Sequence, residues 1–244
     1  MSDDIFIKKM QDIVRLCEKY HTPRFSKFLD EKEQALLKKE GILGGILFGG
    51  YENAERCMLG VFPKWQEPDT SYFPIKVLEF TKKYDKEITH RNYLGTILSL
   101  GIERSKIGDI LAGDKVSYVF VSEDISEFIK DNIRKVSGCG VDIRMCGFDE
   151  ITVPERRFEL IDAVAASLRA DAVLAALLKI SRSDAKAFIL SGKVSVNHSE
   201  ISGVDFLLKE GDLLSVRGFG RAELFEVGNK TRSDRIHVTL RKYI

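Results

Sequence analysis

The order of elements predicted between residues 168 and 227 constrains the fold more than any other feature: two short helices, then short strands joined by turns. Apolar residues of the first helix recur at a spacing that places them on one face: Val173, Leu174, Leu177 and Leu178. Ser181 is predicted to cap the second helix, with Asp184 three residues later as in a weak capping box, and Gly192 is predicted to end it. The segment is therefore predicted to form a pair of short helices followed by a small sheet.

The second helix is predicted to have an apolar side and a basic side. The residues of its apolar stripe are Ala185, Phe188 and Ile189. Arg182 and Lys186 lie four residues apart, so they share a different side that faces solvent. After this helix, residues 194–197 alternate like a half-buried strand, and residues 209–212 are predicted to form a turn before a strand at 213–217.

Basic residues outnumber acidic ones along this stretch. Between residues 167 and 193 the basic residues are Arg169, Lys179, Arg182, Lys186 and Lys193, and the acidic ones are Asp171 and Asp184. A helix N-terminus favours anions, so Ser181, Arg182 and Ser183 together are predicted to hold a phosphate. The bias returns in the last thirty residues, which include Arg217 and Arg221. Arg182 and Lys186 alone would indicate only a solvated helix face, but the whole ordered pattern favours RNA binding.

This ordered pattern resembles the S4 RNA-binding domain, in which two short helices with basic residues precede a small twisted sheet. The resemblance implies a function on structured RNA rather than small-molecule chemistry. The residues predicted to bind RNA in this domain are Arg169, Ser181, Arg182, Ser183, Lys186, Lys193, Arg217 and Arg221.

Three domains and an α+β fold class are predicted. An N-terminal α/β domain is placed at residues 1–74, an RRM-like (ferredoxin-like) middle domain at 75–155, and the S4 domain with C-terminal strands at 156–244. The first boundary follows from the loop between Pro63 and Pro74, which holds three of the five prolines and the only tryptophan.

The first domain is predicted to contain two helices and two strands. An amphipathic helix is predicted at residues 4–20, and a second helix at 31–39 with Asp30 as its N-cap. Strand-like runs occur at residues 41–50 and 59–62.

The middle domain is predicted to alternate strands and helices. Strands are expected at residues 75–84, 116–121 and 141–144, and helices at 90–100, capped by Thr89, and 125–136, with Ile125, Phe128, Ile129 and Ile133 on one side. This order is compatible with the split βαβ sandwich of ferredoxin-like and RRM folds. An RRM normally carries an aromatic RNP1 strand, and no such pattern is found. Contact between this domain and RNA is therefore expected to depend on shape or charge rather than on base stacking.

Three further segments resemble the YlmH family, bacterial S4-domain proteins of Gram-positive cell-division gene clusters. These segments are Thr89–Gly95, Leu100–Ile110, and Phe48–Tyr51 together with Glu55 and Arg56. Asn92 departs from the pattern, because the family is expected to carry aspartate more often at that position. The resemblance implies the three-domain order given above. It also implies binding to the large ribosomal subunit, to its rRNA and to stranded peptidyl-tRNA, in support of rescue of the stalled nascent chain.

A second basic surface is predicted in the middle domain. Its residues are His90, Arg91, Arg104 and Lys106. His90 beside Arg91 has the chemistry of a general base, but an RNA contact or a structural role at the helix start is the favoured interpretation.

The sequence offers little support for a cofactor or metal site. Gly45 and Gly50 have the outer spacing of a phosphate-binding loop, but Tyr51 and Glu52 stand where lysine and serine or threonine are required. The glycines are expected instead to allow a tight bend. The cysteines (Cys17, Cys57, Cys139 and Cys146) lack CxxC spacing and the histidines (His21, His90, His198 and His237) are scattered, so no metal site is expected.

The chain is expected to be soluble and cytoplasmic. Its N-terminus is acidic and lacks the layout of a signal peptide, and the apolar run at residues 41–50 is too short to span a bilayer. The favoured function is a non-catalytic RNA-binding factor that acts on rRNA and tRNA, with other rescue factors as further partners.

Two alternatives remain open. One is an RNA-modifying enzyme, since S4 domains are often appended to such enzymes. The nearest string to the catalytic aspartate motif of a pseudouridine synthase is 168–171, which is also the predicted start of the S4 helix. The other alternative is an adaptor protein linked to cell division, with Trp65 and the proline-rich loop as an exposed patch.

Overall fold

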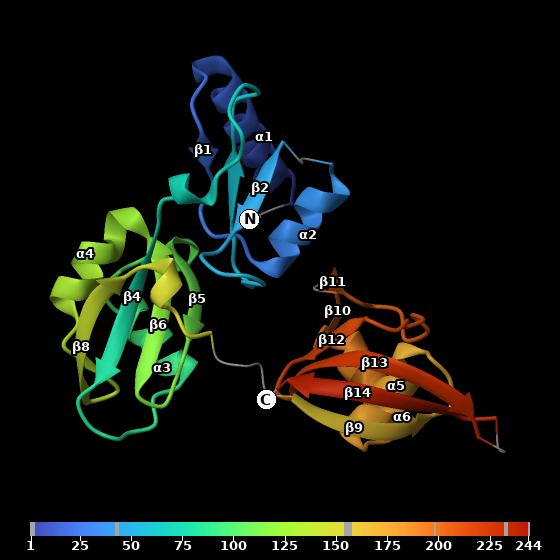
Figure 1. The fold of residues 1–244 in the computed structure, drawn as a ribbon. Coiled ribbons are helices and arrows are strands. Elements are labelled where there is room, and N and C mark those ends of the chain that lie inside the picture. Colours follow the sequence, from blue (N-terminus) through green and yellow to red (C-terminus); the bar gives the residue numbers. More distant parts are fainter. Residues whose placement is uncertain (1–2, 42–43, 154–157, 198, 232–233, 244) are drawn as a thin grey trace. The chain divides into compact units, whose positions relative to one another are not determined.

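A computed structural model of the chain describes residues 3–41, 44–153, 158–197, 199–231 and 234–243. It divides the chain into two compact units, Met1–Pro154 and Glu155–Ile244 (Figure 1). The boundary predicted between residues 155 and 156 lies outside the described residues. The boundary predicted between residues 74 and 75 stays a prediction, because both sides of it belong to the first unit.

The first unit begins with two helices on a small antiparallel sheet. The helices are α1 (Asp3–Tyr20) and α2 (Glu31–Lys39), and the strands, in spatial order, are β1 (Arg24–Phe25), β3 (Met58–Val61) and β2 (Gly45–Phe48). Both predicted helices are confirmed. Asp30 caps α2, because its Oδ1 accepts the Glu33 N–H at 2.9 Å while Glu33 Oε2 accepts the Asp30 N–H at 2.9 Å.

The second part of the first unit has the ferredoxin-like topology that was predicted. Its sheet is fully antiparallel, in the order β5 (Ile107–Leu111), β6 (Val116–Ser122), β4 (Ile75–Lys82), β8 (Cys139–Cys146) and β7 (Lys135–Val136). Helix α3 (His90–Leu98) follows β4, and α4 (Glu123–Asn132) follows β6. Without the two-residue β7, the chain order is βαββαβ, which is the split βαβ arrangement. The sequence missed β5, since Gly108 and Asp109 interrupt its apolar run.

Helix α4 is shorter than predicted. It ends at Asn132, and Val136 lies in strand β7 instead. The placement of Phe128 on the buried side was also wrong, because its side chain is 48% exposed whereas Ile125 and Ile129 are buried. Residues four apart define a narrow stripe on this helix, and Phe128 falls at its edge.

The two faces of the middle sheet are covered by different parts of the unit. One face packs against α3 and α4 through Leu78, Phe80, Val119 and Val121. The opposite face, from Ile75, Val77, Tyr118 and Phe120, packs against aromatic side chains of the first 74 residues: Phe25, Phe28, Phe48, Phe62 and Phe73. In an RRM this second face stacks RNA bases. Here it is buried within the unit, which leaves it unavailable for base stacking.

Glycines allow the aromatic layer to approach the middle sheet this closely. A Cβ atom on Gly50 would lie 2.4 Å from the ring of Phe120, and one on Gly108 would lie 2.6 Å from the ring of Phe28. Gly50 also has a φ of +103°, which other residues rarely adopt. The glycine run was expected to bend the chain between a strand and a helix, whereas the bend at Gly50 lies between strands β2 and β3. The space beside Gly50 and Gly108 is filled by aromatic side chains.

The second unit is a six-stranded antiparallel sheet with two helices on one face (Figure 1). Its strand order is β11 (Ser199–Glu200), β10 (Val194–Val196), β12 (Leu213–Val216), β13 (Gly220–Lys230), β14 (Ile236–Tyr243) and β9 (Phe158–Ala165). The two helices are α5 (Ala170–Leu178) and α6 (Arg182–Leu190), as predicted. The predicted cap is confirmed, since Ser181 Oγ accepts the Asp184 N–H at 3.1 Å, and Gly192 follows α6 with a φ of +66°.

Replacement of Gly108 by alanine is expected to destabilise the first unit by roughly 1–3 kcal/mol, because the new methyl group overpacks the buried Phe28 ring. Gly95→Ala is the matched control, since no atom lies within 4 Å of a Cβ built there and the residue is in the interior of α3. That variant is expected to gain up to about 1 kcal/mol from helix propensity. Urea unfolding of both variants measures the two effects, and equal stability of Gly108→Ala and the wild type would contradict the packing described.

Candidate nucleic-acid interface

A buried carboxylate organises the basic surface of the second unit. Asp171 lies in the first turn of α5 with its side chain completely buried. Arg169 Nε donates to Asp171 Oδ1 at 3.2 Å, and Arg182 Nη2 donates to Asp171 Oδ2 at 2.7 Å. The arginine side chains themselves remain 37% and 49% exposed. One carboxylate inside the unit thus holds two cations at its surface.

Local backbone geometry brings these two arginines together. Arg169 immediately precedes α5, and the next N–H, that of Ala170, donates to the Phe206 carbonyl at 2.8 Å. At the other end of α5, Lys179 adopts a left-handed conformation with φ of +55°, which turns the chain back. The cap at Ser181 then starts α6 with Arg182 as its first residue. The start of α6 consequently lies beside the start of α5.

The pKa of Asp171 is lowered from its ordinary value of 3.8. Burial is the largest single influence and raises the pKa, but the hydrogen bonds from Arg182 and Arg169, with their charges, outweigh it. The carboxylate is therefore ionised at neutral pH and keeps both guanidinium groups oriented.

Arg182 and Lys186 are both exposed, as predicted, but they differ in their partners. Arg182 is tied to Asp171, whereas Lys186 forms no ion pair with any residue that the structure describes. The solvent-facing placement of both residues is confirmed, but the ion pair of Arg182 with buried Asp171 was not predicted, because the sequence does not reveal which buried group its guanidinium reaches.

The predicted phosphate seat at the start of α6 already contains an anion. Ser181 Oγ donates to Asp184 Oδ2 at 2.7 Å and lies 3.0 Å from Ser183 Oγ. The Asp184 carboxylate thus sits in the first turn of the helix, where the helix dipole stabilises it. Binding of phosphate by Ser181 and Ser183 stays a prediction. It requires the Ser181 hydroxyl to leave Asp184 and donate to the phosphate instead.

Two further predicted contacts meet at the far end of α6. The Arg217 N–H donates to the Lys193 carbonyl at 2.9 Å, so the residue just after β12 is a neighbour of the residue just before β10, and both side chains are exposed. Lys193 Nζ lies 5.4 Å from the centroid of the Phe188 ring. Arg221 pairs with Ser215 on the neighbouring strand and is only partly exposed.

The predicted residues of the middle domain divide into two groups. His90 and Arg91 are exposed at the start of α3. Arg104 instead turns to the backbone, where its Nη1 donates to the carbonyls of Ile107 and Gly108 at 2.5 and 3.3 Å. Lys106 donates to a carboxylate oxygen of Asp124 at 2.5 Å. An RNA contact by these four residues stays a prediction, and the geometry gives Arg104 a structural role.

Partial burial and nearby charges shift the pKa values of two of these groups. Burial, and then the charge of Arg56, lowers the pKa of Arg104 to about 10, so its guanidinium remains cationic at neutral pH. Burial, and then the charge of Arg104, lowers the pKa of His90 below its ordinary value of 6.5. At neutral pH His90 is therefore a neutral imidazole that can donate and accept hydrogen bonds.

Sequence reasoning missed the role of Asp109. Its Oδ2 accepts from the Tyr51 hydroxyl at 2.7 Å and from the Glu55 N–H at 2.7 Å, and its Oδ1 accepts from the Arg56 N–H at 3.0 Å. The segments around Tyr51 and Asp109, both singled out for their family resemblance, thus form one network. The sequence did carry a signal for this role, namely an aspartate within the otherwise apolar run of residues 107–111.

Asn92 performs the capping task expected of its position. Its Oδ1 accepts the Thr89 N–H at 3.0 Å and lies 2.9 Å from the Thr89 hydroxyl, which donates to it. An aspartate oxygen would accept the same two bonds. The departure from the family pattern therefore leaves the start of α3 intact.

The described residues offer no sign of a metal centre or of a membrane span. No group of three His, Cys, Asp or Glu side chains in the described ranges is arranged to hold a metal ion. No helix in the described part of the chain has both the length and the apolar character needed to cross a bilayer.

Comparison with known proteins shows the family to which the chain belongs. Residues 68–150 match the family described as "Putative RNA-binding domain in YlmH", and residues 168–214 match the S4 domain. A Bacillus subtilis (strain 168) protein named "Ribosome-associated protein quality control protein P2" is 30% identical over 243 residues, which cover 97% of this chain and 94% of that protein. The chain belongs to the YlmH family of S4-domain RNA-binding proteins.

The fold agrees with a solved structure from the YlmH family. The structure titled "Cell division protein ylmH from Streptococcus pneumoniae" matches with a TM-score of 0.52 and 20% identity, over 62% of this chain and 94% of that one. The S4 match of this chain, residues 168–214, contains Asp171, Arg182 and Lys186. The two arginines held by Asp171, with Lys186 and Lys193, thus lie within the S4 match, whereas Arg217 and Arg221 lie just beyond its end.

Replacement of Arg182 by alanine is expected to destabilise the second unit by roughly 1–3 kcal/mol, because the buried carboxylate of Asp171 loses one of its two cationic partners. Lys186→Ala, on the same helix, is expected to change stability by no more than about 0.5 kcal/mol. Hydrogen exchange of the α5 and α6 amides reports the opening free energy of this unit in both variants. Equal protection in the two variants would contradict the ion pair.

The difference in stability between the wild type and Arg182→Ala is expected to depend on pH. The pKa of Asp171 is lower in the folded chain, so its contribution is full above the ordinary value of 3.8 and is lost as the pH falls through the folded pKa. Protonation of Asp171 in the unfolded state is the same in both chains, so the difference starts to shrink when the pH reaches the pKa that Asp171 has in the folded variant, which lacks the hydrogen bond and charge of Arg182. It continues to shrink until the pH has fallen through the folded pKa of the wild type. A difference that grows on acidification would show that another group is responsible.

Proposed function

We propose that this protein is a non-catalytic RNA-binding factor that binds the large ribosomal subunit, through rRNA and tRNA, during rescue of stalled peptidyl-tRNA complexes. The observation that carries the proposal is the pair of exposed arginines held by buried Asp171 within the S4 domain. The Bacillus relative, named for ribosome-associated protein quality control, supports the ribosome as the site of action. We place this activity in the cytoplasm, with other rescue factors as further partners.

The chemistry of this surface suits a phosphate backbone. Guanidinium groups bind phosphate oxygens through paired hydrogen bonds, and Arg169 and Arg182 present theirs already oriented. Lys186, Lys193 and Arg217 add cationic side chains that are exposed on the same unit. Contacts of this kind give affinity and orientation, and they weaken as salt rises.

The first unit supports a second, weaker contact. His90 and Arg91 are exposed at the N-terminus of α3, where the helix dipole also attracts phosphate. Two modest surfaces on one chain gain from effective concentration, so they can hold a composite target far more tightly than either alone. A site where tRNA meets large-subunit rRNA is such a target.

The geometry argues against the alternative of an RNA-modifying enzyme at the two candidate sites. Asp171, in the string nearest to a pseudouridine synthase motif, is completely buried and bound to two arginines, so it cannot reach a base. At Gly49 and Gly50 the space that a Cβ would occupy is filled by Ala54, Arg56 and Phe120, so these glycines are accounted for by close packing within the protein. The buried aspartate and the close-packed glycines thus each have a structural role in the fold.

Co-sedimentation of the intact chain with ribosomal particles tests the proposal. The wild type is expected to sediment with free large subunits that carry peptidyl-tRNA more than with assembled ribosomes. The double variant Lys186→Ala and Lys193→Ala should dissociate at lower salt, with a salt slope reduced by roughly two units, because each lost phosphate contact removes about one. This variant leaves the Asp171 ion pairs intact.

The double variant Lys8→Ala and Arg15→Ala is the matched control, because both residues are exposed on α1, outside the S4 domain. It removes the same charge and should sediment like the wild type. Failure of the wild type to sediment with any ribosomal particle would overturn the proposal. Retention of the Lys186→Ala and Lys193→Ala variant at every salt concentration would show that this part of the S4 surface is not the contact.

A further inference from the structure

A pocket lies along the side of α6 that does not carry Arg182 and Lys186. Its volume is about 420 Å³, within the range of about 300–1,000 Å³ typical of small-ligand sites. Its lining residues are Ile180, Asp184, Ala187, Phe188, Ser191 and Lys193. Four of these, at positions 184, 187, 188 and 191, recur at helical spacing and so share one side of α6.

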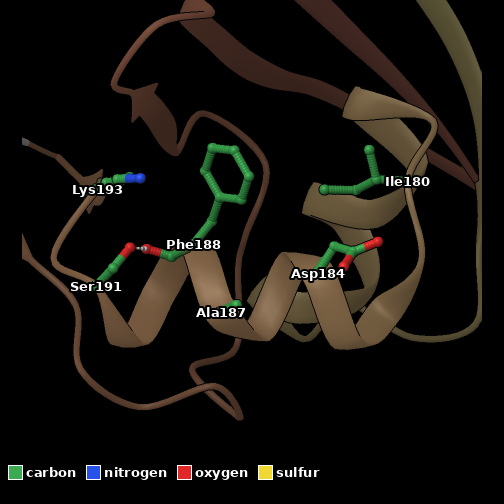
Figure 2. A pocket seen from close by; sticks show the side chains of 6 residues that line it. All are labelled: Ile180, Asp184, Ala187, Phe188, Ser191 and Lys193. Atoms are coloured by element: carbon green, nitrogen blue, oxygen red, sulfur yellow. Dashed lines mark hydrogen bonds between the residues drawn. The ribbon is translucent and has the colours of Figure 1, made fainter.

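The pocket combines an aromatic surface with charges of opposite sign at its two ends. Figure 2 shows the Phe188 ring in the middle, Lys193 beyond the end of α6, and Asp184 near its start. Ile180 and Ala187 complete the apolar wall. The Ser191 hydroxyl donates to the Phe188 carbonyl at 3.0 Å, which fixes the last turn of the helix (Figure 2).

We infer that this pocket binds the base of an unpaired RNA nucleotide, with the base stacked on Phe188 and its phosphate at Lys193. The inference rests on the proposed RNA-binding function and adds the kind of nucleotide that the S4 domain selects. Unpaired bases are commonly recognised by stacking on aromatic side chains.

Charge sets the orientation of the nucleotide. The phosphate belongs at the cationic end, where the exposed side chains of Lys193 and Arg217 are neighbours. The base then points toward Asp184, whose carboxylate can accept a hydrogen bond from an N–H group on the edge of the base, such as N3–H of uracil. The reverse orientation would set a phosphate against a carboxylate.

A stacked base and its phosphate can replace the contact that Lys193 now makes with the Phe188 ring. The ammonium group lies 5.4 Å from the ring centroid, a cation–π contact at a partly exposed site. Such a contact is weaker than a stacked base, and the flexible lysine can move its charge to the phosphate. The pocket also lies on the same short helix as Arg182, so one RNA strand can contact both sides of α6.

Binding of short synthetic RNAs to the intact chain tests the inference. The probes are a heptamer of uridine and a heptamer of ribose phosphates that lacks all bases, each with the same fluorescent label. The wild type is expected to bind the uridine heptamer about tenfold more tightly, which corresponds to ~1.4 kcal/mol for one stacked base. Phe188→Leu should remove this preference, since leucine keeps the apolar contact but has no ring.

Two variants separate stacking from folding. Phe188→Tyr retains a ring and is expected to retain the preference for the uridine heptamer. Leu190→Ala removes an apolar side chain from the same helix outside the pocket, where it is 71% exposed, and should behave like the wild type. If Phe188→Leu keeps the preference, or if Phe188→Tyr loses it while hydrogen exchange shows an intact second unit, the inference is wrong.

The failure of this inference and the failure of the proposed function give different results. Equal binding of the two heptamers by the wild type would overturn the base pocket and leave the phosphate-binding surface standing. Binding of neither heptamer at low salt, together with no sedimentation with ribosomal particles, would overturn the proposed function and the base pocket with it.

Discussion

The basic surface of the S4 domain depends on the ion pairs between the buried carboxylate of Asp171 and two arginines. Transfer of a carboxylate from water to a protein interior costs several kcal/mol, and good hydrogen bonds from cations can offset that cost. Arg169 and Arg182 supply those bonds. Because each guanidinium is already held on one side, it loses less conformational freedom when its other side meets a phosphate. The same contact thus stabilises the fold and orients the two guanidinium groups that we propose bind RNA.

A second constraint decides which part of the chain is available to RNA bases. The middle sheet has the topology of an RRM, but its open face is packed against aromatic side chains of the first 74 residues. Gly50 and Gly108 permit this packing, and the network around Asp109 joins the two layers at their edge. With that face buried, the first unit is left with charge and shape as its means of contact. This burial agrees with the inference that base recognition belongs to the second unit.

Local sequence signals predicted the helices and their caps well. The bounds of α2 and the roles of Asp30, Ser181 and Thr89 follow from capping residues and helical spacing within a few positions of one another. In the second unit the same kind of signal predicted α5, α6, β10 and β12 in their order, whereas β9, β13 and β14 were not predicted individually.

Features that depend on distant contacts could not be predicted in this way. Strand β5 was missed because Asp109, within it, is satisfied by groups more than fifty residues earlier in the chain. The partner of Arg182 is eleven residues away on another helix, and no spacing rule connects the two. The exposure of Phe128 depends on how α4 packs against the sheet. In each case the deciding interaction is tertiary.

The central claim is that the S4 surface around Arg182 contacts large-subunit rRNA and tRNA. The most direct test is an RNA crosslinking map from cells in which a photo-crosslinking amino acid replaces Lys186, which is exposed beside Arg182 but outside its ion pair. The same replacement at Lys8, on α1, is the control. The account predicts crosslinks to large-subunit rRNA and tRNA at position 186 that are absent at position 8. Crosslinks from position 186 to mRNA alone, or the same RNAs from both positions, would contradict it.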